Sequence, residues 1–395
     1  MTVPRSLRLG VISLHTDPFA SPGSGDVGGM NVVVRHTCEA LARQGHGVEV
    51  FTRWSDPAAP QYEERAGVVI HRLEVGPVRS IPKGEHELHM AEFARQLALA
   101  ARFDLLHSHH WFSGMAAVPV AREWGVPHVQ SFHSIAAPES TELAEGERPE
   151  SPGRLQGEAF LASVSDRVVA VSNAEARTAV ERLKAAPARL RVIHPGVDSV
   201  AFAPRGVGSE GRPTVLVAAR LEPLKGVDLA ISMLAELPVD TRPLLQVAGG
   251  PSADLDFVDS LTELARELGV GDDVAFLGPR NRGQLAELMR AASLVLVPSH
   301  SETYGLVALE AAASGVPVVA GAVGGLNEAV RDGVTGVLLP TRDPAAWADV
   351  VARLLADPAE RARLGAAGRE YALGRSWDSV ALSLATVYRE ALARP

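Results

Sequence analysis

The sequence predicts an α/β protein with two doubly wound, Rossmann-like parallel-sheet domains that face a central cleft. Two observations support this fold class. Short apolar runs of the buried-strand type alternate with helical stretches, and the alternation restarts near residue 214. The 395 residues also exceed the ~250 residues that one hydrophobic core usually organises. We therefore expect an N-terminal domain over residues 1–197, a C-terminal domain over 198–376 and a terminal helix over 377–395.

The two halves present their elements in a similar order. The first half begins with a strand at 7–14 and a polar, Gly-rich loop, after which a helix begins near Met30; further strands are expected at 48–51, 67–71, 105–107, 126–129 and 167–171. The second half has expected strands at 214–218, 244–248, 274–277, 294–297 and 316–320. Pro and Gly residues between 195 and 212, including Gly196 and Gly206, indicate a hinge. The amphipathic segment 377–392 predicts a helix that folds back across both domains.

The composition argues against several classes of protein. The net charge of −9 disfavours nucleic-acid binding, which needs a basic face. No apolar run approaches the ~20 residues that span a bilayer, and the N-terminus lacks the plan of a signal peptide. The single cysteine, Cys38, can form no internal disulfide, which suits a reducing compartment. We expect a cytoplasmic protein that does not insert into a membrane.

The most informative stretch joins the strand at 294–297 to a helix that begins near Leu306. A helix N-terminus offers unpaired N–H groups and a positive dipole end, which suit a phosphate or a sugar oxygen. Glu302 lies at this junction, and Glu310, about two turns further on, could bind the hydroxyls of a ribose. Glutamates at such positions are also ordinary in helices. A second Gly-rich turn at 324–328 opens another helix, and two adjacent helix N-termini facing one crevice are typical of nucleotide sites in open α/β sheets.

A glycine-rich loop follows the first strand of the N-terminal half, and two cations follow the first strand of the C-terminal half. Arg220 and Lys225 come directly after the strand at 214–218, at the end of the sheet where ligands bind in this architecture. An arginine grips phosphate in a bidentate manner and a lysine acts as a compact charge, so together they could neutralise a departing diphosphate. The loop at 21–31 contains Gly28 and Gly29, which would let the backbone approach a ligand closely.

Four histidines raise the alternative of a metal site: His107, His109, His110 and His133. Strand alternation would place His107 and His109 on one side, but no carboxylate or cysteine accompanies them at a ligand-like spacing. We therefore expect no metal. His133, which follows the strand at 126–129, is better suited to donate a hydrogen bond to a sugar hydroxyl.

Taken together, these motifs resemble those of the retaining glycosyltransferases of family four, which have the two-domain GT-B fold. The resemblance covers nearly the whole chain, and its most specific part is the pair Glu302 and Glu310, which matches the E-x7-E motif of the family. It implies a hexosyltransferase that takes its sugar from a UDP-sugar, retains the anomeric configuration and needs no metal or other cofactor. It also suggests a homodimer.

The resemblance assigns roles to individual residues. Arg220 and Lys225 would stabilise the leaving diphosphate, while Glu302 and His133 would bind the transferred sugar. The residues expected to bind the sugar donor are Gly28, Gly29, Arg280, Thr303, Tyr304, Gly305, Leu306 and Glu310. No general base is evident, and in the usual proposal for the family a diphosphate oxygen takes the proton of the acceptor.

Within the family, the stretches 14–18, 25–32 and 107–111 are most similar to the D-inositol 3-phosphate glycosyltransferases of mycothiol biosynthesis, which use UDP-N-acetylglucosamine. Those enzymes hold the acceptor phosphate with Lys, Tyr, Thr and Arg. The corresponding residues here, expected with Asn31 to bind the acceptor, are Lys83, His110, Ser134 and Arg154. His110 and Ser134 depart from that pattern, and Val33 stands where these relatives usually carry Tyr.

These departures leave the acceptor open. Glu139, Glu142, Glu145 and Glu147 follow the expected acceptor wall, where added carboxylates would suit a cationic ligand. We therefore expect an aminocyclitol or aminoglycoside-like acceptor, as in antibiotic biosynthesis. Inositol 3-phosphate stays a close alternative, because Lys83 and Arg154 are retained. A sugar-nucleotide epimerase is more remote, since its acid/base pattern around the sugar C2 is missing.

Overall fold

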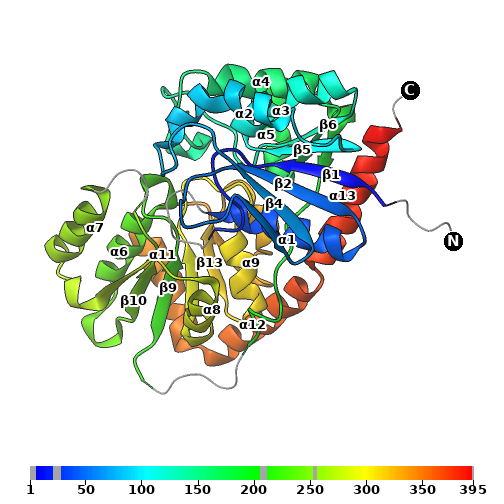
Figure 1. The fold of residues 1–395 in the computed structure, drawn as a ribbon. Helices are drawn as coiled ribbons and strands as arrows, with labels where there is room; N and C mark the ends of the chain where they lie inside the picture. Colours follow the sequence, from blue (N-terminus) through cyan, green and yellow to red (C-terminus); the bar gives the residue numbers. More distant parts are fainter. Residues whose placement is uncertain (1–5, 21–27, 205–210, 252–255, 394–395) are drawn as a thin grey trace.

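The computed structural model describes residues 6–20, 28–204, 211–251 and 256–393. Two parallel β-sheets, each with helices on both faces, form two domains that lie against one another (Figure 1). This confirms the predicted α/β architecture. The predicted hinge residue Gly206 and the loop residues 21–27 lie outside the described residues. Among the helices that the structure describes, none combines the length and apolar character needed to cross a membrane.

The N-terminal sheet has eight strands in the order β3-β4-β2-β1-β5-β6-β7-β8. Its strands are β1 (Arg8–Ile12), β2 (Gly47–Arg53), β3 (Tyr62–Arg65), β4 (Val68–Leu73), β5 (Leu105–His109), β6 (His128–Ser131), β7 (Arg167–Ala170) and β8 (Leu190–Val192). All neighbours pair in parallel except β3 and β4, which are antiparallel. Its helices are α1 (Gly29–Arg43), α2 (Met90–Leu97), α3 (Trp111–Trp124), α4 (Arg154–Val164) and α5 (Asn173–Leu183). The six strands expected from the sequence are present, and β3 and β8 were not predicted.

The C-terminal sheet has six parallel strands in the order β11-β10-β9-β12-β13-β14. They are β9 (Thr214–Ala218), β10 (Leu244–Ala248), β11 (Val274–Gly278), β12 (Leu294–Val297), β13 (Val318–Gly321) and β14 (Gly336–Leu339). The helices in this part of the chain are α6 (Val227–Glu236), α7 (Asp256–Glu267), α8 (Arg282–Ala291), α9 (Leu306–Ala313), α10 (Leu326–Ala329), α11 (Pro344–Ala356), α12 (Pro358–Leu373) and α13 (Trp377–Leu392). Of these six strands, only β14 was not predicted from the sequence.

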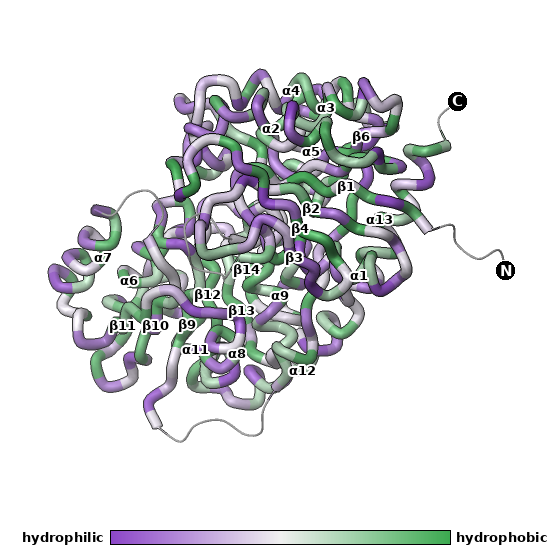
Figure 2. The backbone as a smooth tube through the Cα atoms, in the orientation of Figure 1, coloured by the Kyte–Doolittle hydropathy of each residue, from purple (hydrophilic) through white to green (hydrophobic). Residues whose placement is uncertain are grey.

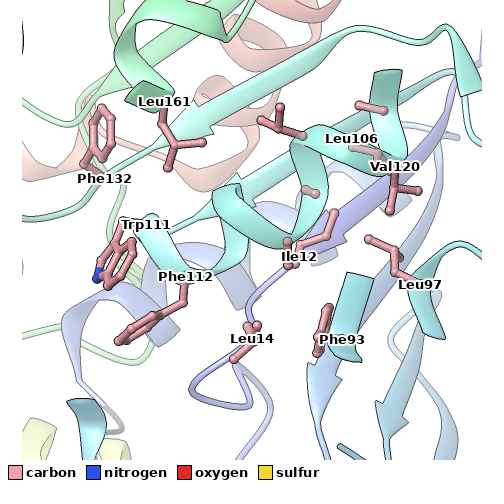
Figure 3. Close-up of a cluster of buried hydrophobic side chains, with 14 of the residues drawn as sticks. Ile12, Leu14, Phe93, Leu97, Leu106, Trp111, Phe112, Val120, Phe132 and Leu161 are labelled. Atoms are coloured by element: carbon pink, nitrogen blue, oxygen red, sulfur yellow. The ribbon is translucent and has the colours of Figure 1, made fainter. Parts of the chain in front are cut away.

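Side-chain alternation along the strands explains why each sheet is covered on both faces. In β1, Leu9 and Val11 join a cluster with α1 and α13, whereas Ile12 joins a cluster with α2, α3 and α4. Figure 3 shows the second cluster, in which Phe93 and Leu97 of α2 approach Ile12. Apolar strands such as β12 and β13 are correspondingly coloured as hydrophobic in Figure 2. A strand buried on both faces needs apolar residues throughout, which is why these short runs could be recognised in the sequence.

The terminal helix α13 belongs structurally to the N-terminal domain. It packs against α1 and β6, and its apolar face contributes Trp377, Leu384 and Tyr388 to the core of that domain. The Oη atom of Tyr388 lies 2.8 Å from Nδ1 of the buried His107 in β5. The chain thus ends against the N-terminal domain (Figure 1), while the domain bounds expected from the sequence stay predictions.

Both sheets reverse their strand order next to their first strand. In the N-terminal sheet β1 lies between β2 and β5, and in the C-terminal sheet β9 lies between β10 and β12. The loops on the two sides of such a switch point leave in opposite directions and open a crevice at the carboxyl ends of the strands. The loops after β1, β5, β9 and β12 all contribute to the space between the domains.

Candidate active site

A cleft of about 380 Å³ lies between the two domains and is lined by residues of both. This volume is within the range of small-molecule sites, roughly 300–1,000 Å³. The predicted site residues that line it are Gly28, Gly29, Asn31, Lys83, His110, His133, Ser134, Arg220, Lys225, Glu302, Thr303, Tyr304, Gly305 and Leu306. Most of the residues singled out in the sequence are thus brought together, although their roles stay predictions.

The C-terminal wall presents Arg220 and Lys225, which directly follow β9. Lys225 ends a short 3₁₀ turn, and Gly226 follows with φ +65°. A Cβ atom at Gly226 would lie 2.1 Å from the carbonyl oxygen of Pro298, after β12. Glycine is needed here because it permits both the positive φ and the close approach. The turn that carries Lys225 is therefore packed tightly against the loop that carries Glu302.

Each of these two cations faces a carboxylate. The Nζ atom of Lys225 lies 2.9 Å from Oε2 of Glu302, and Nη2 of Arg220 lies 3.1 Å from Oε1 of Glu222. Lys225, the residue predicted to stabilise the leaving group, thus forms an ion pair with Glu302, the residue predicted to bind the sugar. A diphosphate would compete with these carboxylates for the cations, and the Lys225 ammonium could donate to it and to Glu302 together, since it has three hydrogens.

The loop between β12 and α9 is fixed by the loop before α10. The Gly325 N–H donates to the carbonyl oxygen of Glu302 at 2.8 Å, and a Cβ atom at Gly324 would come within 2.2 Å of that oxygen. Gly305, with φ +102°, then directs the chain into α9. The N-terminus of α9 opens on the cleft as predicted, whereas α10 has only four residues and offers a weaker dipole than a full helix.

Two predicted nucleotide-binding residues do not line the cleft. Glu310 is buried on α9, where its Oε1 atom lies 2.9 Å from Nη1 of Arg282. Burial raises the pKa of Glu310, against the pull of Arg282. Arg280 is half-buried and donates to the carbonyl of Pro279. The ribose and nucleotide roles of these two residues stay predictions, and binding of a ribose by Glu310 would need the ion pair to open.

The N-terminal wall begins at the start of α1. Gly29 approaches the other domain so closely that a Cβ atom would lie 3.3 Å from Cδ1 of Leu306. Asn31 is buried and its amide is already occupied: Nδ2 donates to Oγ1 of Thr16, and Oδ1 accepts from the Gly28 N–H. Asn31 therefore fixes the shape of this wall, and a role in binding the acceptor stays a prediction.

The two basic residues expected at an acceptor phosphate are both paired with carboxylates. Lys83 Nζ lies 2.7 Å from Oε1 of Glu147. Arg154 pairs with Glu150 and, through Nε at 2.8 Å, with Glu158. Its Nη2 atom also donates to Oγ of Ser134.

The Arg154 side chain is fully buried and does not line the cleft. Burial alone would raise the pKa of Glu147, but Lys83 and Arg154 hold it well below its usual value.

His110 is a buried polar residue on the cleft wall with unused hydrogen-bonding capacity. Its backbone has φ +68°, in the left-handed region that non-glycine residues rarely adopt. Neither ring nitrogen has a hydrogen-bond partner in the part of the chain that the structure describes. Burial, followed by the neighbouring His15, lowers the pKa of His110 well below its usual value. The imidazole is neutral and can both donate to and accept from a ligand.

Some carboxylates lie elsewhere than expected. Glu139 and Glu142 are exposed and do not line the cleft, which corrects the prediction that they flank the acceptor wall; Glu145 and Glu147 do line it. Glu150 and Glu158 were missed, although their i, i+4 spacing around Arg154 was a usable signal. Among the described residues, no cluster of three or more His, Cys, Asp or Glu could hold a metal ion.

Glu175 in α5 was also missed, and it lines the cleft beside His133. Its Oε2 atom accepts the backbone N–H of Val171 at 2.6 Å. Burial raises the pKa of Glu175 to about 7, even though N–H groups of Val171 and His133 donate to it. A proton is therefore retained in the folded state over a range in which the unfolded chain has lost it.

This buried carboxyl predicts a pH-dependent stability. Between its unfolded pKa, roughly 4.3, and about 7, the folded state binds more protons than the unfolded state, so the free energy of unfolding falls as the pH rises. Glu175→Gln should remove on the order of 2–3 kcal/mol of that fall between pH 5 and pH 8. Urea unfolding at both pH values measures it. The exposed Glu181→Gln on the same helix is the control, and equal pH slopes for wild type and Glu175→Gln would contradict the prediction.

Comparisons with known proteins place the chain among sugar-transferring enzymes. Residues 27–200 match the family model Glycosyltransferase Family 4, and residues 202–371 match Glycosyl transferases group 1. The chain is 40% identical to the D-inositol 3-phosphate glycosyltransferase of Nocardioides sp., over 98% of this chain and 90% of that protein. The Thermobifida fusca protein of the same name is also 40% identical, over 98% of this chain and 94% of the relative.

The solved structure of sucrose-phosphate synthase from Thermosynechococcus elongatus is similar, with a TM-score of 0.88 and 31% identity, over 98% of this chain and all of the other. The predicted GT-B architecture is thereby confirmed.

Proposed function

This chain belongs to the family 4 glycosyltransferases, and from that premise we propose that it moves a hexose or aminohexose from a UDP-sugar to a hydroxyl of a small, amine-bearing cyclitol. We further propose that the reaction retains the anomeric configuration and needs no metal ion. The observation that carries the acceptor assignment is the pairing of Lys83 and Arg154 with carboxylates.

The sugar-donor half of the proposal rests on where charge develops. Breaking the glycosyl–phosphate bond leaves negative charge on the diphosphate, and fixed cations at that point are typically the largest catalytic contribution. Arg220 and Lys225 stand at the carboxyl end of β9, close to the N-terminus of α9. With these cations in place a metal ion is not needed to neutralise the leaving group.

The acceptor half rests on the charge balance of the N-terminal wall. Two cations, Lys83 and Arg154, face three carboxylates, Glu147, Glu150 and Glu158. A phosphate dianion entering here would have to compete with these carboxylates for Lys83 and Arg154, and it would be repelled by Glu147, which lines the cleft. An ammonium group would instead find a carboxylate held ionised by its neighbours. The wall therefore favours an aminocyclitol or aminoglycoside-like acceptor.

A second candidate, transfer of N-acetylglucosamine to inositol 3-phosphate, is favoured by a different observation. The relatives that carry that name are 40% identical over nearly the whole chain. Lys83 also lines the cleft and could exchange Glu147 for a phosphate. Arg154 could not do so without leaving the buried Glu158 unpaired.

Release of UDP decides between the two. UDP-N-acetylglucosamine and UDP-glucose are each supplied with inositol 3-phosphate, 2-deoxystreptamine or paromamine, with and without EDTA. We expect turnover with an amine-bearing acceptor and no loss in EDTA. Turnover with inositol 3-phosphate alone would overturn the acceptor assignment in favour of the second candidate, and UDP release that does not depend on any acceptor would argue against transfer altogether.

The charge argument makes a residue-level prediction. Glu147→Gln should raise KM for the amine-bearing acceptor roughly ten- to hundredfold, because hydrogen bonds to charged groups contribute about 1.5–3 kcal/mol. The KM for the sugar donor should not change. Glu139→Gln is the matched control, since Glu139 is exposed and off the cleft. A gain in turnover of inositol 3-phosphate, with no effect on the amine-bearing acceptor, would contradict the proposal.

A further inference from the structure

A pair of histidines connects the cleft wall to the buried core of the N-terminal domain. His133 lines the cleft, and its Nε2 atom lies 2.8 Å from Nδ1 of His109, at the end of β5. The rings are nearly parallel, with centroids 5.0 Å apart. A hydrogen bond between two ring nitrogens contains one hydrogen, so one nitrogen donates and the other accepts.

Both rings of this pair are neutral near pH 7. Burial lowers the pKa of His133 to about 4. Burial, reinforced by His107 and His133, lowers the pKa of His109 well below its usual value. Each neutral imidazole carries a single N–H, and therefore the tautomers of the two rings are linked. If His109 donates from Nδ1, His133 must carry its own proton on Nδ1, which is the only ring nitrogen it has left for a ligand.

The surroundings hold both rings in this arrangement. The ring of His107 lies beneath that of His109, with centroids 4.2 Å apart. His107 is itself held by Tyr388 of α13 at Nδ1 and by Ser131 of β6 at Nε2. The backbone of His133 has φ +63°, in the left-handed region that non-glycine residues rarely adopt. Neither ring can rotate away without breaking contacts in the core.

We propose that His109 is a positioning residue that donates from Nδ1 to Nε2 of His133 and so holds His133 in the tautomer that donates from Nδ1 into the cleft. A sugar donor is rich in oxygen acceptors, and a fixed N–H in the wall binds such an oxygen with no proton to rearrange. The inference rests on the proposed function for the identity of the ligand. The tautomer itself is a property of the free protein and can be observed without any substrate.

Two variants and one spectroscopic measurement test this role. In His109→Asn the side-chain amide can still donate to His133, whereas His109→Leu cannot. With whichever acceptor supports turnover, we expect His109→Leu to lower kcat roughly ten- to hundredfold, as when a partner that fixes a histidine tautomer is removed. The KM for the UDP-sugar should stay unchanged, and His109→Asn should retain most of kcat.

The tautomer is read from the ¹⁵N shifts of histidine-labelled protein, with the His133 signals assigned by their loss in His133→Asn. Wild type and His109→Asn should show the Nδ1–H form of His133, and a folded His109→Leu should shift toward Nε2–H. An Nε2–H form in the wild type, or full kcat in His109→Leu, would overturn the inference. Because the spectra need no substrate, a failure of the proposed function is distinguishable from a failure of this inference.

Discussion

Replacing Lys225 by Met should lower kcat for glycosyl transfer about 10²–10³-fold, the loss typical of removing one fixed group that stabilises developing negative charge. The Lys225 ammonium stands at the carboxyl end of β9, 2.9 Å from Glu302. Its removal takes away a charge where the diphosphate departs and also leaves Glu302 without its partner. Steady-state UDP release with saturating acceptor measures the effect.

The control is Lys184→Met, because Lys184 is an exposed lysine at the end of α5. That variant should keep wild-type kcat. If Lys225→Met raised KM for the UDP-sugar and left kcat unchanged, Lys225 would bind the ground state and the transition state equally. Such a result would contradict its role in stabilising the leaving group.

Replacing Arg154 by Met should destabilise the protein by about 3–5 kcal/mol, the range for removing one partner of a buried ion pair. Arg154 is fully buried between Glu150 and Glu158, and a methionine would leave the buried Glu158 without its ion-pair partner and Glu150 with only Lys83, 4.0 Å away. Urea unfolding followed by circular dichroism gives the change in the free energy of unfolding. A decrease of this size in the free energy of unfolding would show that Arg154 stabilises the structure of the N-terminal wall and is not held free to bind a phosphate.

Arg266→Met provides the matched comparison. Arg266 also pairs with a glutamate, Glu263, but both side chains are largely exposed on α7. Exposed pairs contribute little because water and salt screen them, and this variant should unfold close to the wild type. An Arg154→Met protein as stable as Arg266→Met would mean that the acceptor wall does not depend on the arginine, and the case against a phosphate acceptor would weaken.

The fold could be predicted largely because most of its strands can be recognised from a few neighbouring residues in the sequence. Eleven of the fourteen strands that the structure describes were expected from short, mostly apolar runs, whereas β3 at Tyr62–Arg65 is polar, exposed and paired on one side only. A strand of that kind has no apolar pattern to detect. β8 at Leu190–Val192 has three residues and a charged centre, so it was missed for the same reason.

Some residues of the candidate site could likewise be predicted from the sequence, and others could not. Arg220, Lys225 and Glu302 follow strands directly, so topology alone brought them to one crevice. The partners of Lys83 and Glu310 could not be predicted, since they are 64 and 28 positions away in the sequence and are selected by packing. The burial of His110 also depends on the tertiary fold, and only the structure shows that neither ring nitrogen has a hydrogen-bond partner among the residues it describes.

The placement of α13 also bears on how the protein is made. Tyr388 and Leu384 complete the core beneath β1 and β5, although Leu384 is synthesised 275 residues after the end of β5 and 372 residues after the end of β1. At roughly 5–20 residues per second, the first domain waits on the order of ten seconds or more with an uncovered apolar face. A nascent chain in this state is a natural client for chaperones. A premature stop codon that removed only α13 would therefore compromise the domain that was synthesised first.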